Sequence, residues 1–321
     1  MSLLSIKRIR KIASVLLFSA IVTISSSAGF ELYPVHPDAL AKEGVPRGTV
    51  IEGIFTASKI YPGTSHGYAV YVPEQYCECG AANLIVFQDG GGFRNADRGV
   101  DATIVLDNLI AKGDIPPTIA LFLSPDSGIG PGQPMYTEAG NRSIEYDSVD
   151  DLFAKFLIEE LMPAALEDYE ITDNPADNWI VGNSSSGNSA FAVAWHRNDL
   201  FGGVITVADS FTNIRDENIW PLAIRSQEPR NIKTFMVVGE LDSNITTYDD
   251  WFLANIEMAR AFEDRGYDYA LAMHKSGHSD AVMRTFLPDI LRWMWNNVEF
   301  TAEHTVVTSS VSDLLSNLNL K

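Results

Sequence analysis

The chain has 321 residues, 46% of them apolar, which suits one α/β domain with a substantial core or two small domains. Its 42 acidic residues outnumber 23 basic ones, and the resulting net charge of −19 disfavours binding to nucleic acids and to anionic membrane surfaces. This composition predicts a soluble, exported protein.

The first 28 residues have the three parts of a secretory signal peptide. Four basic residues between Lys7 and Lys11 precede an apolar run from Ile12 to Ile24, and small residues ending at Ala28 follow it. An uncleaved anchor is the alternative, but the apolar run is short for a membrane span. We therefore expect cleavage after Ala28, a secreted or periplasmic location and no stable membrane insertion. Losing four basic and no acidic residues would take the net charge from −19 to −23.

Apolar runs and helical periodicity alternate along the rest of the chain. Strands are predicted over residues 49–55, 67–72, 83–88, 118–123, 178–181, 203–208, 234–238 and 269–273. Helices are predicted over residues 102–112, 149–169, 188–195, 251–265 and 281–298. This alternation requires a mostly parallel sheet with helices on both faces, a three-layer α/β sandwich.

The sequence shows no repeat, low-complexity segment or linker that would divide this fold. We expect one domain over residues 29–300 and a polar tail over 301–321, with a weak apolar pattern near Leu314 and Leu315. Residues from Ser124 to about Asp147 are rich in Gly and Pro and are predicted as a long loop, which is usually functional or mobile.

The two cysteines, Cys77 and Cys79, are separated by one residue. A disulfide across one residue would be strained, and a metal site needs more ligands than these. They are therefore interpreted as a pair of loop cysteines of undetermined redox state, and the fold cannot depend on disulfide stapling.

A serine-rich turn from Gly182 to Gly187 joins a predicted strand to a predicted helix. A serine between small residues at such a turn is typical of the nucleophile elbow of α/β-hydrolases, G-x-S-x-G. The second glycine of that pattern is replaced here by Ser186, so the pattern alone leaves open which serine is the nucleophile. Ser184 is the preferred candidate.

A nucleophilic serine needs a base and an acid that orients the base, in the chain order Ser, Asp or Glu, His in this fold. Asp242 and His278 follow two later strands and keep this order. Asp242 could instead cap the following helix, with Glu240 as the acid, and His274 is the second candidate for the base.

Negative charge on the substrate oxygen requires two backbone N–H groups. Ser185, directly after the candidate nucleophile, and Gly91, in the glycine-rich loop after residue 88, are predicted to supply them, although the loop could be a plain glycine turn. Trp220 and Trp251, expected on loops at the same edge, could stack on an aromatic acyl group or a sugar, or could be core or lid residues.

Several segments together resemble the esterase D and enterochelin-esterase-like branch of the α/β-hydrolases, to which feruloyl and other carbohydrate esterases are similar. The resemblance covers about residues 45–298 and rests on Phe87–Gly92, Leu106–Ile110, Asn141–Asp147, Gly182–Gly187, Ser210–Arg215 and Gly277–His278. Aligning Gly182 and Gly187 with the first and last glycines of the family elbow places the nucleophile at Ser184. The resemblance implies a metal-independent enzyme without a cofactor, acting on a small-molecule or carbohydrate ester.

The resulting hypothesis is an exported serine carboxylic-ester hydrolase with the triad Ser184, His278 and Asp242. A feruloyl, acetyl-sugar or siderophore-type ester is the expected substrate. Two alternatives stay open: a catalytically inactive binding protein of the same fold, and an acyltransferase. The sequence does not indicate an oligomeric state.

Overall fold

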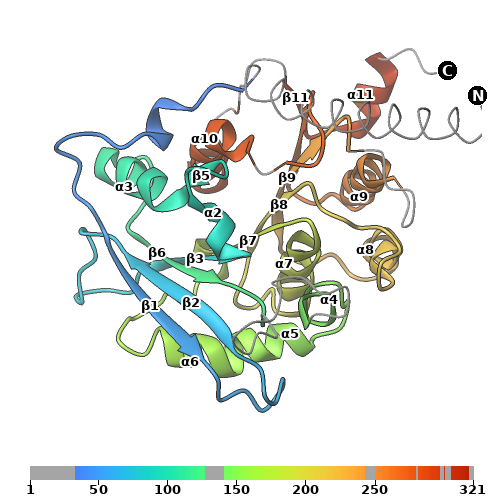
Figure 1. Cartoon of the computed structure of the whole chain (residues 1–321). Coiled ribbons are helices and arrows are strands. Elements are labelled where there is room, and N and C mark those ends of the chain that lie inside the picture. Colours follow the sequence, from blue (N-terminus) through green and yellow to red (C-terminus); the bar gives the residue numbers. More distant parts are fainter. Residues whose placement is uncertain are drawn as a thin grey trace, which may run out of the picture.

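The computed structural model describes residues 33–126, 141–242, 250–279, 281–296, 300 and 305–317 (Figure 1). The predicted signal peptide lies outside these residues, as does most of the expected loop after Ser124. Within the described residues, no helix combines the length and apolar character needed to cross a membrane.

A single large sheet organises the described part of the chain, with nine strands in the order β1-β2-β6-β3-β7-β8-β9-β10-β11. Its strands are β1 (Thr49–Phe55), β2 (His66–Val72), β3 (Asn83–Gln88), β6 (Thr118–Leu123), β7 (Asn178–Asn183), β8 (Gly203–Val207), β9 (Lys233–Gly239), β10 (Tyr269–His274) and β11 (Thr305–Thr308).

The six central strands, from β6 to β10 in sheet order, run parallel, whereas β1, β2 and β11 pair antiparallel to their neighbours. This confirms the predicted mostly parallel sheet. Because the carboxyl ends of parallel strands meet at one edge, the connections that leave β3, β7, β9 and β10 all begin there.

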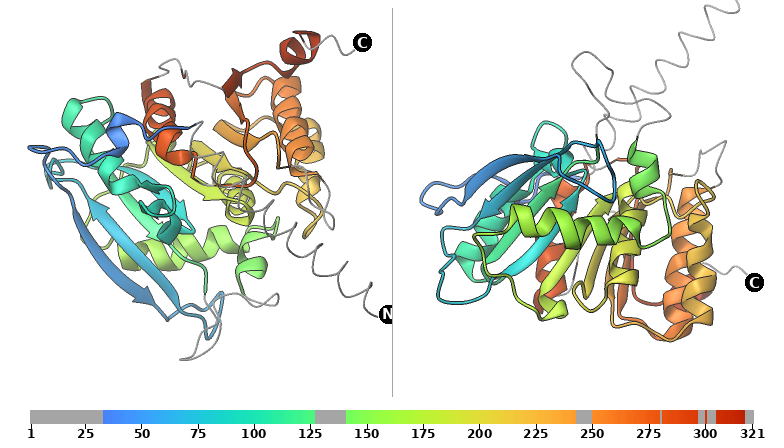
Figure 2. Two further views of the ribbon diagram at one scale, coloured as in Figure 1. Left: turned by 45° about the horizontal axis from the view of Figure 1, so that its top comes forward. Right: turned by 90° about the horizontal axis from the view of Figure 1, so that it is seen from below.

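Helices cover both faces of the sheet (Figures 1 and 2). One face carries α3 (Ala102–Lys112) and α10 (Met283–Asn296); the other carries α5 (Leu152–Lys155), α6 (Met162–Ala165), α7 (Ser185–His196), α8 (Trp220–Ser226) and α9 (Trp251–Arg265). Alternate strand residues enter the two cores: Leu84 and Val86 pack with the second group of helices, and Ile85 and Phe87 with the first. Burial on both faces explains why the central strands are apolar at nearly every position.

The helix predicted over residues 149–169 is shorter and less regular in the structure. Helical backbone runs from Leu152 to Ala165, and its middle is a π-helical segment, η2 (Phe156–Leu161). The predicted apolar stripe is buried except at Leu152, which is 40% exposed. Leu152 is the first helical residue, and a helical side chain points back over the turn before it.

The sequence pattern did not reveal the shorter elements. They are η1 (Pro37–Ala39), α2 (Gly90–Phe93), β4 (Arg94–Asn95), β5 (Val100–Asp101), α4 (Asn141–Tyr146), η3 (Pro175–Asp177), η4 (Glu217–Ile219) and α11 (Val311–Asn317). Helix α8 was missed as well, and α4 lies within the stretch predicted as a loop.

Part of the expected polar tail belongs to the domain. β11 extends the sheet beside β10, and the buried Val311 at the start of α11 donates its backbone N–H to the hydroxyl of Tyr269. The hydroxyl of Ser310 also donates to Glu263 on α9. Four strand residues are too few to show a periodic pattern, which is why the sequence did not indicate this strand.

Candidate active site

Ser184 lies at the sharp turn between β7 and α7. Its φ of 59° and ψ of −131° are unusual for a non-glycine residue. Although it holds the N-cap position, its side chain makes no capping hydrogen bond within the described structure, and it is partly exposed. Its backbone N–H instead donates to the carbonyl of Val207 on β8 (3.0 Å). A strained residue between a strand and a helix is the backbone arrangement expected of a nucleophile elbow.

The residues on each side explain why the turn can be so tight. A Cβ atom on Gly182 would lie 1.9 Å from the carbonyl oxygen of Ser186, so only glycine fits there. The fully buried hydroxyl of Ser186 accepts from the N–H of Asn183 (2.8 Å) and donates to the carbonyl of the same residue (2.7 Å). Ser186, which replaces a glycine of the usual pattern, therefore fastens the first helical turn to the end of β7.

Unusual backbone conformations concentrate at this edge of the sheet. In the described residues, positive φ occurs at five non-glycine positions: Asp89, Ser184, Ala208, Phe211 and Asp216. All five lie in the connections that leave the carboxyl ends of β3, β7 and β8. Residues held in such conformations cluster at functional sites, and their cost is offset by surrounding structure.

His278 and Asp242 form a hydrogen-bonded pair at the same edge. The imidazole Nδ1 lies 3.0 Å from Asp242 Oδ2; the histidine side chain is 41% exposed and the aspartate 2%. A buried carboxylate at Nδ1 orients the ring and favours the tautomer with a proton on Nδ1. Nε2, on the opposite side of the ring, is then the nitrogen able to accept a proton.

The structure distinguishes Asp242 from its two alternatives. Glu240 pairs with Lys275, whose Nζ lies 2.7 and 2.8 Å from its carboxylate oxygens. The cap of α9 is Asp250, whose side chain accepts from the N–H of Leu253. The carboxylate beside His278 is thus that of Asp242.

His274, the second candidate for the base, is fully buried. Its Nδ1 lies 2.8 Å from the hydroxyl of Ser276, and its ring packs against Tyr33 and Phe286. Burial lowers its pKa to about 4, so the ring stays neutral at physiological pH. His274 is placed as a core residue, away from solvent.

The two tryptophans have different positions, and neither is on a loop: each begins a helix. Trp251 packs edge-on against His278, with ring centroids 4.8 Å apart and an interplanar angle of 80°. Trp220 is 2% exposed, donates its indole N–H to Asn188 Oδ1 (2.7 Å) and packs on Phe191. The expectation that Trp220 could stack on substrate is therefore corrected, because its ring is enclosed in the core, whereas Trp251 adjoins the candidate site.

Gly91 is the second residue of α2, which directly follows β3, and it is exposed. A Cβ on Gly91 would meet nothing within 4 Å among the described atoms, whereas one on Gly90 would lie 2.6 Å from Phe122. The glycine required for packing is thus Gly90, while Gly91 faces open space. Backbone N–H groups in a first helical turn lack intrahelical acceptors and can bind an anion. Ser185 is the first residue of α7 and so also lies in a first helical turn.

Comparison with known proteins gives the family of the chain. A family model described as "Esterase: Putative esterase" matches residues 60–294. The chain belongs to this esterase family. It is a carboxylic ester hydrolase with the α/β-hydrolase fold.

Solved structures resemble the esterase at low sequence identity. A ferulic acid esterase is 14% identical with a TM-score of 0.59, over 78% of this chain and 100% of that one. An enterobactin esterase from Shigella flexneri, solved in the presence of 2,3-di-hydroxy-N-benzoyl-serine, is 17% identical with a TM-score of 0.64, over 82% of this chain and 63% of that one. A mutant feruloyl esterase module from Clostridium thermocellum, complexed with sinapinate, is 15% identical with a TM-score of 0.58, over 85% and 96%. At these identities the likeness shows the fold.

Helix α4 contacts two segments of the candidate site, the start of α2 and helix α7. Arg142 binds the carboxylate of Asp89, the residue that precedes α2, through two N–H groups (3.3 and 2.5 Å). The carbonyl of Tyr146 accepts from the side chain of Asn188 on α7 (2.7 Å). One short helix thus contacts both segments expected to supply oxyanion donors. Arg142 and Tyr146 fall in a motif that marked the resemblance, but nothing in the sequence indicated what they touch.

Two buried carboxyl groups, those of Asp209 and Glu217, lie near helix α7. The sequence did not predict them. Burial raises the pKa of Asp209 well above its usual range. Burial also raises the pKa of Glu217 to about 10, so the Glu217 carboxyl is protonated at neutral pH. The hydroxyl of Ser210 donates to Glu217. The carboxyl of Asp209 would lie 2.6 Å from a Cβ on Gly187, so it fills the space below the first turn of α7. Among the described residues, no group of three or more His, Cys, Asp or Glu could hold a metal ion.

Proposed function

We propose that the protein is a serine esterase in which Ser184 is the nucleophile, His278 the general base and Asp242 the residue that orients the base. The main support is the combination of the Ser184 backbone conformation with the His278–Asp242 hydrogen bond at the same edge of the sheet. β7, β8, β9 and β10 are consecutive in the sheet, so the segments that carry the three residues are neighbours.

The reaction follows from these positions. His278 takes the proton of the Ser184 hydroxyl through Nε2 while the serine oxygen attacks the ester carbonyl. The N–H groups of Ser185 and Gly91 stabilise the negative charge on the tetrahedral oxygen. The protonated imidazole, stabilised by Asp242, then gives its proton to the leaving alcohol. Water, activated in turn by His278, releases the acid from the acyl-enzyme.

For the substrate, we propose an uncharged ester with an aromatic acyl group, such as a hydroxycinnamoyl sugar. The net charge of −19 would repel a polyanionic substrate and slow its approach. Trp251 packs beside His278 with 8% of its surface exposed, which leaves a small part of the ring within reach of a substrate. Two of the similar structures are a ferulic acid esterase and a feruloyl esterase module complexed with sinapinate. We further propose that the enzyme acts outside the cytoplasm, because residues 1–28 have the pattern of a signal peptide.

A fluorophosphonate probe and a panel of esters test this proposal. The probe should label Ser184, identified by peptide mass spectrometry, and Ser184→Ala should lower the hydrolysis of p-nitrophenyl acetate by at least about 10³-fold. Ser226→Ala, at an exposed serine on α8, is the matched control and should retain the wild-type rate. Activity of Ser184→Ala at the wild-type rate would refute the assignment, and failure of the probe to label any serine would favour an inactive binding protein.

The substrate class needs a separate measurement. Methyl ferulate and feruloyl sugars should give higher kcat/KM values than acetyl esters or an iron–catecholate ester. Product analysis with added sugar distinguishes hydrolysis from acyl transfer, since a transferase would form a new ester at the expense of the free acid.

A further inference from the structure

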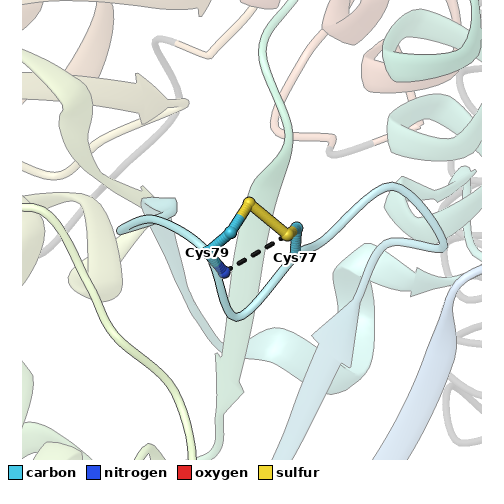
Figure 3. Close-up of a disulfide and its surroundings, with 2 residues drawn as sticks. All are labelled: Cys77 and Cys79. Carbon is cyan, nitrogen blue, oxygen red and sulfur yellow. Dashed lines mark hydrogen bonds between the residues drawn. A yellow bond between two sulfur atoms is a disulfide. The ribbon is translucent and has the colours of Figure 1, made fainter.

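The connection between β2 and β3 carries a disulfide that the proposed esterase reaction does not use. Cys77 and Cys79 are bonded to each other (Figure 3), with Cα atoms 5.1 Å apart, within the range that disulfides span. The sequence left the redox state of the two residues undetermined, and in the structure they are oxidised. The loop leaves the carboxyl end of β2, which is antiparallel to β6, and enters the amino end of β3. It therefore lies at the edge of the sheet opposite to Ser184.

This disulfide does not hold the loop in place. The ring of Tyr76 packs on Tyr169 (centroids 5.7 Å apart), and its hydroxyl accepts from the N–H of Glu170 (3.2 Å). The N–H of Ala82 donates to the carbonyl of Glu170 (2.8 Å). These contacts fasten both ends of the loop to the body without the sulfur atoms. A bond that closes a ring over three residues also restricts the unfolded chain far less than one that closes a long loop.

The position of the disulfide makes it accessible to other molecules. Cys77, Glu78, Cys79 and Gly80 are all exposed. A thiol in solution can therefore approach the sulfur atoms without unfolding of the domain. Exposed disulfides are those most open to thiol exchange, whereas structural disulfides resist reduction.

The two sulfur atoms are not equivalent. The backbone N–H of Cys79 donates to Sγ of Cys77 (3.2 Å), a contact drawn as the dashed line in Figure 3. A hydrogen bond to sulfur stabilises a thiolate, so Cys77 is the better leaving group and Cys79 the sulfur that is attacked. The neighbouring Glu78 and the acidic surface repel anionic thiols, which favours uncharged or cationic ones.

We propose that Cys77–Cys79 is a thiol–disulfide exchange site that oxidises uncharged or cationic small thiols and dithiols. A thiolate attacks Sγ of Cys79, the S–S bond breaks, and its electron pair leaves on Sγ of Cys77. A second thiolate attacks the sulfur of the bound thiol and releases Cys79. Two thiols become one disulfide, and the protein gains two electrons and two protons as two Cys thiols.

The first test uses the folded, full-length protein. Cysteamine (cationic) and mercaptoethanesulfonate (anionic) are added at equal thiolate concentration, and free protein thiols are counted by maleimide mass shift. Cysteamine should reduce the disulfide at least about threefold faster, with the Tm and the p-nitrophenyl acetate rate unchanged. Reduction only in denaturant, equal rates for the two thiols, or a Tm that falls on reduction would each overturn the proposal.

The second test addresses the direction of attack. Cys79→Ser leaves Cys77 as a free thiol, and Cys77→Ser leaves Cys79. The backbone N–H at position 79 remains in both variants, so the thiol of Cys77 should react with an aromatic disulfide reagent at pH 7 at least about threefold faster than that of Cys79. The reverse order would overturn the assignment of the leaving group. Neither test depends on Ser184 being the nucleophile, so the two proposals can fail separately.

Discussion

The hydroxyl of Ser186 is predicted to stabilise the elbow measurably. Ser186→Ala removes two buried hydrogen bonds to Asn183, each contributing about 1–1.5 kcal/mol, and leaves a backbone N–H and a carbonyl to find other partners. Alanine is the better helix former by about 0.5 kcal/mol, which offsets part of the loss. The free energy of unfolding should therefore fall by about 2 kcal/mol, which corresponds to a Tm lower by about 3–4 °C for a domain of this size.

The assay is thermal unfolding by calorimetry, together with p-nitrophenyl acetate hydrolysis at 25 °C, well below the Tm. Ser226→Ala is the matched control, because its hydroxyl also bonds a helical carbonyl, that of Leu222 (2.7 Å), but at an exposed position. It should change stability by less than about 0.5 kcal/mol. If Ser186→Ala kept the wild-type Tm, the reasoning that this hydroxyl fastens the turn would be refuted. A normal Tm with a reduced kcat would also contradict it, since the effect would then lie in the chemistry alone.

Three further changes test the surroundings of the site. Arg142→Ala should lower kcat by about 10-fold or more with little change in KM, because Asp89 would no longer hold the start of α2 where the oxyanion donor is needed. Trp251→Ala should lower kcat by about 3- to 10-fold, because His278 loses the ring that restrains it, whereas Trp251→Phe should keep most of the activity. Glu217→Gln should become more stable relative to the wild type as the pH rises from about 5 to 9. The measurement is the Tm of the variant minus that of the wild type, which should increase with pH. The pKa of Glu217 is about 10 in the folded protein and about 4.5 when unfolded, so between these values the folded state holds a proton that unfolding releases, and raising the pH destabilises the wild type.

Each of these has its own control. Arg142→Lys keeps the charge but loses the two-pronged contact, so activity between wild type and alanine would support the geometric role, and full activity of the alanine variant would exclude it. If Trp251→Phe lowered kcat as much as Trp251→Ala does, the size of the side chain, and not its aromatic edge, would be what His278 requires. Parallel Tm curves for wild type and Glu217→Gln across the pH range would show that Glu217 is ionised in the folded protein.

Much of the fold could be predicted because local signals agreed with burial. The bounds of β3 and β6 match the predicted strands, since both strands are buried on two faces and are apolar except for Asn83, Gln88 and Thr118 at their ends. Helices α3 and α9 also match, because Gly113 and Gly266 end them in the left-handed conformation that glycine adopts most easily. The sequence did not predict α2, because its first three residues are glycines, which are poor helix formers. It did not predict β11, because this short strand is recognisable only through its pairing with β10.

The candidate site could be predicted where the position of a residue directly after a strand was enough to place it at the carboxyl edge of the sheet. Asp242 and His278 were chosen because they follow strands, and the structure brings their side chains into contact. The pairing of Glu240 with Lys275 and the burial of Trp220 depend on side-chain direction, which the sequence pattern does not contain. The same holds for Arg142, whose partner Asp89 is 53 residues away along the chain.

The position of β11 has a consequence for the biosynthesis of the protein. During translation, β10 and every candidate catalytic residue leave the ribosome before residues 305–308, so the unpaired N–H and C=O groups of β10 are open until this last strand arrives. An open, apolar strand edge is a template for pairing with another chain. A chain cut after Phe300 would contain the whole candidate site but would be prone to aggregate. β11 therefore protects the edge of the sheet from pairing with other chains, a role that is separate from catalysis.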